Sequence, residues 1–204
     1  MDIFILATFV AIGFQLATSR YQKGRIAMLA SHLGNYQIEK LMETLTEGYM
    51  RALGEADSDR RTQIWQLLHT TEANLASQLG RFAAEFSKVN ASAAQVSRLP
   101  VALPYADRLL ASVPQASFDL REAFAIHARG IASLVDNRDA KSASDHAYAL
   151  SAELFLLQHT CHWFCKSRSV ASARLLARHR TPHAQVLASV TPATRAAYCA
   201  LTGM

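Results

Sequence analysis

The residues of this chain that could perform metal or redox chemistry gather in one short stretch. It reads QHTCHWFC, residues 158 to 165, and contains two histidines and two cysteines. Thiolates and imidazoles are preferred zinc ligands, and two cysteines one helical turn apart can reach the same ion. The stretch is therefore a candidate metal or haem site, and its candidate ligands are His127, His159, Cys161, His162 and Cys165.

A second interpretation of this stretch needs no ligand. On a helix from about residue 142 to 165, Cys161 and Cys165 continue an apolar stripe that includes Leu150, Leu154 and Leu157. Free cysteine commonly serves as a small buried apolar residue. The spacing is CxxxC and not CxxC, so a redox pair is not indicated. The stripe favours core positions for the two cysteines, and convergence of His127 on them would favour a metal site instead.

No other catalytic or nucleotide-binding motif occurs along the chain. The eight glycines are isolated, which excludes a P-loop and a GxGxxG turn. GxSxG and HExxH are absent, and so is the Glu-x-x-His pair of four-helix di-iron sites. These absences predict a protein that is not an enzyme and that has no cofactor unless the metal or haem alternative holds.

Composition indicates a folded chain in a reducing compartment. Of 204 residues, 50% are apolar and 18% are charged, which is typical of a protein with a substantial core. The three cysteines, Cys161, Cys165 and Cys199, are an odd number near one end of the chain. This is not the arrangement of a secreted disulfide framework.

The N-terminal segment IFILATFVAIGFQLA, residues 3–17, carries no charge. Extended to Ser19 as a helix it is about 25 Å long, close to the lower limit for crossing a bilayer core of about 30 Å. The chain begins Met1-Asp2, without the basic residues that open a secretory signal peptide. We expect residues 1–19 to form an apolar helix that anchors the protein in a membrane, and residues 20–204 to form a helical domain.

Basic residues directly after this segment predict its orientation. Arg20, Lys23 and Arg25 follow the apolar run, and basic flanks are retained on the cytoplasmic side. The expected location is the inner or plasma membrane, with the N-terminus outside and the C-terminal domain in the cytoplasm. In the alternative, a cytoplasmic protein, residues 3–17 are the buried first helix of a soluble bundle.

The rest of the chain reads as a series of helices, with few strand signals. The first helix is expected to continue to His32, and residues 91–114, with three prolines, form a connector across the bundle. The residues expected to cap later helices are Asn35, Asp57 or Ser58, Ser117, Ser142, Thr181 and Thr191. The predicted fold is all-α, a single multi-helix bundle of about six to eight helices with a strongly apolar N-terminal helix.

The net charge of +5 arises in the last quarter of the chain. Glu153 is the last acidic residue, and six basic residues follow it. Five of them are the candidate anionic-surface-binding residues: Lys166, Arg168, Arg174, Arg178 and Arg180. Acidic lipid is favoured over nucleic acid because the only aromatic residue after Phe164 is Tyr198, which leaves few rings for stacking on bases.

These features together predict a non-enzymatic, membrane-tethered cytoplasmic helical protein that acts through partner or lipid binding. Two alternatives stay open. One is a soluble all-α protein that binds a metal or haem through His159, Cys161, His162 and Cys165. The other is a basic nucleic-acid-associated protein.

Overall fold

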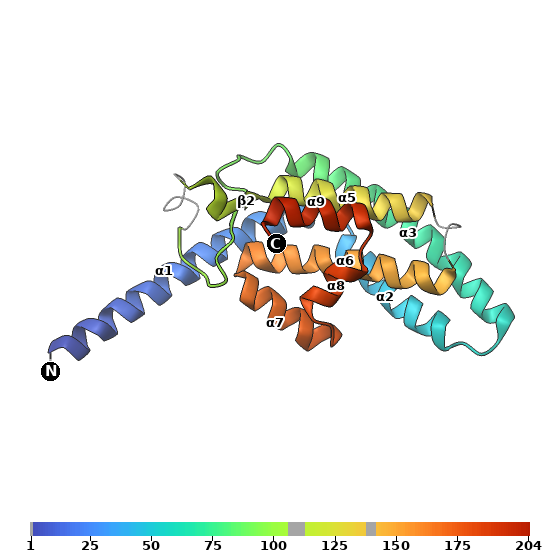
Figure 1. Ribbon diagram of the computed structural model, residues 1–204, viewed down its shortest axis with the longest axis horizontal. Coiled ribbons are helices and arrows are strands. Elements are labelled where there is room, and N and C mark those ends of the chain that lie inside the picture. The colour runs from blue at the N-terminus through green and yellow to red at the C-terminus, as the bar shows by residue number, and fades with distance from the viewer. Residues whose placement is uncertain (1, 106–112, 138–141) are drawn as a thin grey trace.

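A long N-terminal helix leads into a bundle of shorter helices in a computed structural model that describes residues 2–105, 113–137 and 142–204 (Figure 1). The eight α-helices among these residues are α1 (Asp2–Leu33), α2 (Ile38–Gly54), α3 (Ser58–Phe86), α5 (Leu120–Asp136), α6 (Ala143–Cys165), α7 (Arg168–His179), α8 (His183–Ser189) and α9 (Pro192–Thr202). The prediction of an all-α bundle with about six to eight helices and an apolar N-terminal helix is confirmed.

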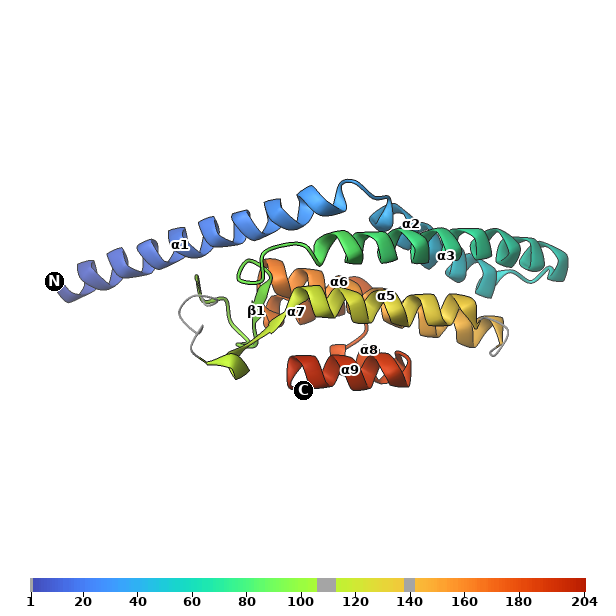
Figure 2. The ribbon, with the colours of Figure 1, turned by 90° about the horizontal axis from the view of Figure 1, so that it is seen from above.

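The central helix of the bundle is α6, which packs against α1, α2, α5, α7 and α8. α2 and α3 form an antiparallel hairpin, and α3 also packs along α5 (Figure 2). The largest core side chains on α3 recur every three or four residues, at Leu75, Leu79, Phe82 and Phe86. The ring of Phe124 on α5 lies 4.9 Å from the rings of both Phe82 and Phe86. Helical periodicity therefore builds the main core between α3, α5 and α6.

Several helix ends follow the capping residues that the sequence predicts. The Asp57 carboxylate accepts hydrogen bonds from the amides of Asp59 and Arg60, and Ser142 accepts one from the amide of Asp145. Thr191 caps α9 in the same way, with Pro192 in the first turn. These side chains satisfy backbone amides that have no partner inside the helix.

Three predicted caps are wrong. α2 begins at Ile38, after Gln37, so Asn35 does not cap it, and α8 follows Pro182 without a cap from Thr181. Ser117 lies in a strand, and α5 begins after Asp119. Asp119 takes the capping position because its carboxylate accepts from the Arg121 amide at 2.9 Å and also pairs with the Arg121 guanidinium.

A short two-stranded ribbon lies before α5 and was not expected from the sequence. β1 (Gln95–Ser97) pairs antiparallel with β2 (Ser117–Asp119), which follows the 3₁₀ turn η1 (Pro114–Ala116). Val96 and Phe118 face each other across the ribbon, and both are buried. The predicted connector, residues 91–114, falls partly outside the described residues.

α1 has two halves in different surroundings. Residues 3–16 are exposed on every side and project away from the bundle (Figure 1). The second half packs against α6 and α3 and places Leu29 in the main core. Of the most apolar 18-residue window of this helix, 0% is buried. The alternative of a buried first helix is therefore wrong for the chain on its own, and α1 is long and apolar enough to cross a membrane.

Arg25 fastens the second half of α1 to the bundle. Its guanidinium donates to the carbonyl oxygens of Phe164 and Gln95, each at 2.7 Å, and lies 3.9 Å from the centre of the Phe164 ring. It also donates to the Tyr21 hydroxyl. One turn away, Lys166 donates to Gln22 at 2.7 Å. Arg25 thus acts as a structural clamp between α1 and the bundle.

Candidate functional site

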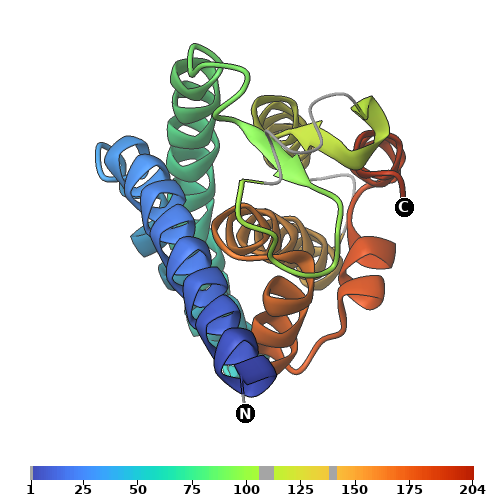
Figure 3. The same ribbon diagram turned by 90° about the vertical axis from the view of Figure 1, so that its left-hand side faces the viewer.

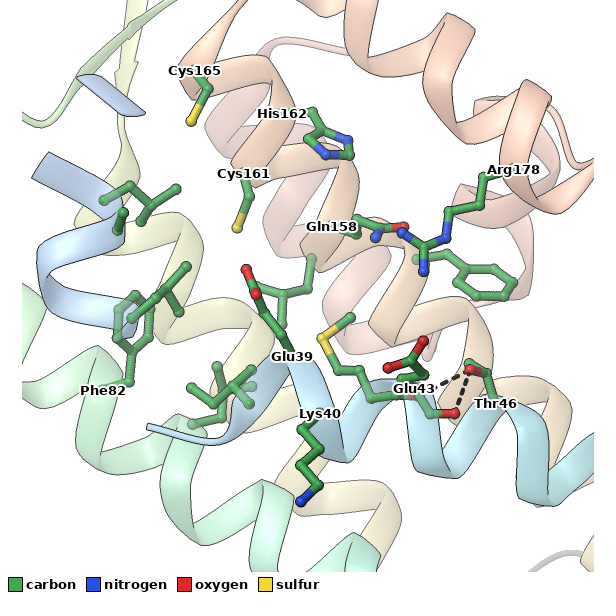
Figure 4. Close-up of a pocket in the computed structure, with 18 of the residues that line it drawn as sticks. Glu39, Lys40, Glu43, Thr46, Phe82, Gln158, Cys161, His162, Cys165 and Arg178 are labelled. Carbon is green, nitrogen blue, oxygen red and sulfur yellow. Dashed lines mark hydrogen bonds between the residues drawn. The ribbon is translucent and has the colours of Figure 1, made fainter. Parts of the chain in front are cut away.

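A groove of about 610 Å³ lies between α1, α2, α6 and α7 (Figure 4). Apolar side chains of four helices form much of its lining; they are Leu29, Leu33, Ile38, Met42, Leu79, Phe82 and Leu157. Its volume is in the range of small-molecule and cofactor sites, about 300–1,000 Å³. The groove is also lined by Gln158, Cys161, His162 and Cys165 of the His/Cys stretch.

The rims of the groove carry charged side chains of both signs. Glu39, Lys40 and Glu43 of α2 are exposed along one side, and Arg178 of α7 lies on the other (Figure 4). Glu39 and Glu43 share a face because helical residues four apart lie one above the other. Both glutamates are exposed to solvent and also border the groove. A ligand with an apolar body and polar ends would match this arrangement.

Cys161 and Cys165 are free cysteines that pack against the main core and line the groove. Burial raises the pKa of the Cys161 thiol, and the nearby Cys165 and Glu39 raise it further. Burial also raises the pKa of Cys165, although Arg25 partly opposes this. Both thiols are therefore protonated at neutral pH, which makes them poor nucleophiles. This agrees with the interpretation of the two cysteines as apolar residues.

The histidines at the groove are neutral at pH 7. Burial lowers the pKa of His162, and Arg174 and Arg178 lower it further. The ring of His179 stacks on Phe155 with centres 3.8 Å apart, its Nε2 lies 2.8 Å from the Gln158 amide oxygen, and burial lowers its pKa as well.

His127 and His159 lie outside the groove. His127 Nε2 is 2.9 Å from the hydroxyl of Thr160, which donates to Leu156 and so can accept from His127 and from Tyr198. His159 stacks on His183 with ring centres 4.1 Å apart, and its Nε2 lies 3.1 Å from the Ser172 hydroxyl. Burial lowers the pKa of both His127 and His159 to about 3.

The five candidate metal ligands are thus divided between three places. Cys161, His162 and Cys165 line the groove, His127 on α5 contacts Thr160 of α6, and His159 on α6 contacts Ser172 of α7. Among residues 2–105, 113–137 and 142–204, no three His, Cys, Asp or Glu side chains are grouped as a metal site requires. The metal or haem alternative stays a prediction that needs direct measurement.

The basic residues of the C-terminal quarter also fall into two sets. Lys166 and Arg168 lie where α6 gives way to α7, and the Arg168 guanidinium is 5.8 Å from the centre of the Trp163 ring. Arg174, Arg178 and Arg180 are exposed at the other end of α7. Arg180 ends that helix in the left-handed conformation, with φ 54°.

Two buried glutamates were missed by sequence reasoning. The Glu72 carboxylate accepts from the Tyr49 hydroxyl at 2.6 Å and lies 3.2 Å from His146 Nε2. Glu153 accepts from the Thr191 amide at 3.0 Å, and burial raises its pKa. Glu153 lies three residues after Leu150 on α6, and Glu72 lies three residues before Leu75 on α3. Each glutamate therefore occupies a position on the apolar stripe of its helix. That placement is the signal that could have identified them.

Gly130 on α5 makes room for the Glu153 carboxylate. A Cβ atom at this position would lie 3.0 Å from Glu153 Oε2 and would overlap the Thr194 hydroxyl. The absence of a side chain therefore lets α5, α6 and α9 approach one another around a buried polar cluster.

Comparison with known proteins adds no relative. No protein-family model, no curated protein and no solved structure matches this chain. Its function is therefore inferred from the geometry described above.

Proposed function

We propose that this chain is a non-enzymatic, membrane-tethered helical protein that holds its bundle at the cytoplasmic face of a membrane and acts there by binding a partner or lipid. One observation carries the proposal: residues 3–16 of α1 are apolar and are exposed around the whole helix. Such a continuous apolar surface is unfavourable in water. A bilayer removes it from water, while the helix satisfies its own backbone hydrogen bonds.

The threonine hydroxyls in and next to this segment are compatible with a lipid environment. The Thr8 hydroxyl donates to the Phe4 carbonyl oxygen at 2.8 Å, and the Thr18 hydroxyl donates to the Phe14 carbonyl oxygen at 2.8 Å. Both hydroxyls are thus satisfied within the helix, which lowers the cost of transferring them from water into hydrocarbon.

The sequence on the bundle side of the segment supports the proposed orientation. Arg20 and Lys23 are exposed immediately after it, and Tyr21 lies between them. Basic residues favour the cytoplasmic flank of a span, and tyrosine is enriched at the interface between lipid and water. We therefore place the bundle, with its three free cysteines, in the cytoplasm.

Membrane extraction tests the anchor. Full-length protein should stay in membranes washed with alkaline carbonate, while a variant that lacks residues 2–16 should be soluble and should keep its helical circular dichroism, because the removed residues are exposed and pack on nothing. Protease protection in right-side-out and inverted vesicles then tests the orientation. Release of the full-length protein by carbonate would refute the anchor, and loss of fold on truncation would show that the segment stabilises the bundle.

The groove is the surface that we assign to partner binding. Its apolar lining and charged rims are suited to a ligand that is apolar along its length and polar at its edges. Thr46 lines the groove, while Thr44, on the same helix, is exposed elsewhere. A photo-crosslinking residue at position 46 should give a discrete adduct in cells that one at position 44 does not. Replacing Met42 in the groove by Asp should abolish the adduct, while the same change at the exposed Met50 should not.

The two alternative functions have separate tests. Stoichiometric metal or haem in untagged protein, lost when Cys161 is replaced by Ala, would establish the metal- or haem-binding alternative. Tight retention of the truncated protein on double-stranded DNA, weakened by salt and by substitutions at Arg174 and Arg178, would favour the nucleic-acid alternative.

A further inference from the structure

The end of the bundle from which α1 projects carries a second group of exposed apolar side chains. Leu99, Val101 and Tyr105 lie in the segment that follows β1, and Val170 lies in the first turn of α7. Val101 is 64% exposed, and the other three are exposed as well. Figure 3 views the molecule from this end and shows the segment after β1 lying across it. We call these four residues the collar.

The collar is held next to α1 by specific contacts. The ring of Tyr105 lies 5.2 Å from the ring of Tyr21 on α1. The carbonyl oxygen of Pro100 accepts from the amide of Ser169 at 3.1 Å, which joins the segment to the start of α7. The carbonyl oxygen of Ser97 accepts from the Trp163 indole at 2.9 Å. The apolar side chains of the collar are thus fixed beside the point where the uncharged run of α1 ends.

We propose that the collar is a second membrane-contacting surface, which enters the headgroup region of an anionic leaflet beside α1 and fixes the orientation of the bundle on the membrane. This inference rests on the proposed α1 anchor. Two observations select lipid as the occupant: the contact between Tyr21 and Tyr105 places the collar beside the residues of α1 that follow its apolar half, and the surroundings of the collar are basic.

The charges around the collar match an anionic leaflet. Arg20 and Lys23 of α1 are exposed, and Lys166 and Arg168 border the collar on the side of α7. The segments 97–105 and 166–170 contain no Asp or Glu. Apolar and aromatic side chains surrounded by Lys and Arg are the combination that binds the interface of anionic membranes.

A second membrane contact would restrict the tilt of the bundle on the membrane. A domain attached through a single helix can adopt different tilts about the membrane plane, whereas a domain with a second contact beside that helix keeps one face toward the lipid. The collar and the groove both contact the second half of α1, so a fixed collar also fixes the direction in which the groove opens.

Depth-dependent fluorescence quenching tests the collar in the full-length protein. A genetically encoded environment-sensitive fluorescent residue replaces Val10 in the anchor, Val101 in the collar, or Leu67 on α3, and each variant is reconstituted in vesicles that contain anionic lipid. Leu67 is a matched control because it is apolar, 73% exposed and in the first half of α3. Figure 2 shows that this half of α3 points away from α1.

The three positions give separable results. We expect emission at shorter wavelength at positions 10 and 101, with quenching by acyl-chain spin labels at position 10 and by headgroup spin labels at position 101, and neither effect at position 67. An aqueous spectrum at position 101 together with quenching at position 10 would overturn the collar and leave the anchor intact. Aqueous spectra at both would overturn the anchor and the collar together. A shift at position 101 that depends on protein concentration in detergent would identify a second copy of the chain as the occupant and overturn the lipid contact.

Discussion

Replacing Val10 by Arg tests the division of α1 into a half that faces lipid and a half that packs on the bundle. Val10 lies in the middle of the uncharged run and is 63% exposed. Leu29, on the same helix, is 4% exposed and belongs to the main core. Val10 is therefore expected to contribute to membrane insertion and not to folding. Leu29 is expected to contribute to folding and not to insertion.

The expected magnitudes follow from the exposed side chains of residues 3–16. Nine large apolar residues lie there, and each contributes about 0.3–0.6 kcal/mol to insertion, or about 3–5 kcal/mol in total. An arginine at the centre of a span costs about 2.5–3.5 kcal/mol, so Val10→Arg should remove most of the insertion free energy. Folding should change by less than about 0.5 kcal/mol, because exposed positions without contacts tolerate substitution. Leu29→Ala should instead destabilise the bundle by about 2–5 kcal/mol and leave insertion unchanged.

Two measurements on each variant separate these effects. Carbonate extraction reports insertion, and urea unfolding in mild detergent, followed by circular dichroism, reports the free energy of unfolding. Leu67→Arg, an equally drastic change on the exposed surface of α3, is the control and should alter neither measurement. The reasoning is refuted if Val10→Arg remains resistant to carbonate, if it lowers the unfolding free energy as Leu29→Ala does, or if Leu29→Ala leaves stability unchanged.

Three further predictions concern the bundle. Because burial lowers the pKa of His127 and His159 from 6.5 to about 3, their contribution to stability is complete above pH 6.5 and is lost as the pH falls. The unfolding free energy should drop by about 2 kcal/mol per histidine between about pH 7.5 and pH 5, and His127→Gln should reduce this drop by the share of one histidine in urea titrations. Gly130→Ala should destabilise the fold by about 1–3 kcal/mol, because the new Cβ atom would overlap the buried polar cluster. Gly80→Ala is the control: nothing lies within 4 Å of its new Cβ atom, and it should stabilise the fold by up to about 1 kcal/mol in the same denaturation assay. Arg25→Ala should lower the free energy of unfolding by about 2 kcal/mol, because it removes two charged hydrogen bonds to backbone carbonyls. Arg25→Lys should restore less than half of this loss in thermal unfolding, because lysine lacks the planar guanidinium group that donates in both directions.

The helices were predictable from the sequence because their signals are local. Asp57, Ser142 and Thr191 begin helices as expected, since each places an oxygen within reach of free amides in the next turn. The ribbon that pairs Val96 with Phe118 was not predictable, because strands of three residues are too short to show an alternating pattern.

The candidate site was predictable only in part. The stripe through Leu154 and Leu157 correctly indicated that Cys161 and Cys165 face apolar surroundings. The groove beside them depends on the separation of α2 from α6 and α7. This separation is set by tertiary packing, so the sequence pattern of a single helix does not predict it. The clamp made by Arg25 was equally invisible, because its carbonyl partners lie 70 and 139 residues away along the chain.

The continuity of α1 has a mechanical consequence. The helix runs without a break from Asp2 to Leu33, about 48 Å at 1.5 Å per residue. Its first half is the proposed anchor, and Leu29 and Leu33 of its last turns form part of the groove wall. An unbroken helix transmits rotation and tilt along its axis. The Arg25 clamp lies between the proposed anchor and the residues of α1 that line the groove. A change in bilayer thickness that tilts the proposed anchor would therefore be transmitted through α1 to the wall of the groove.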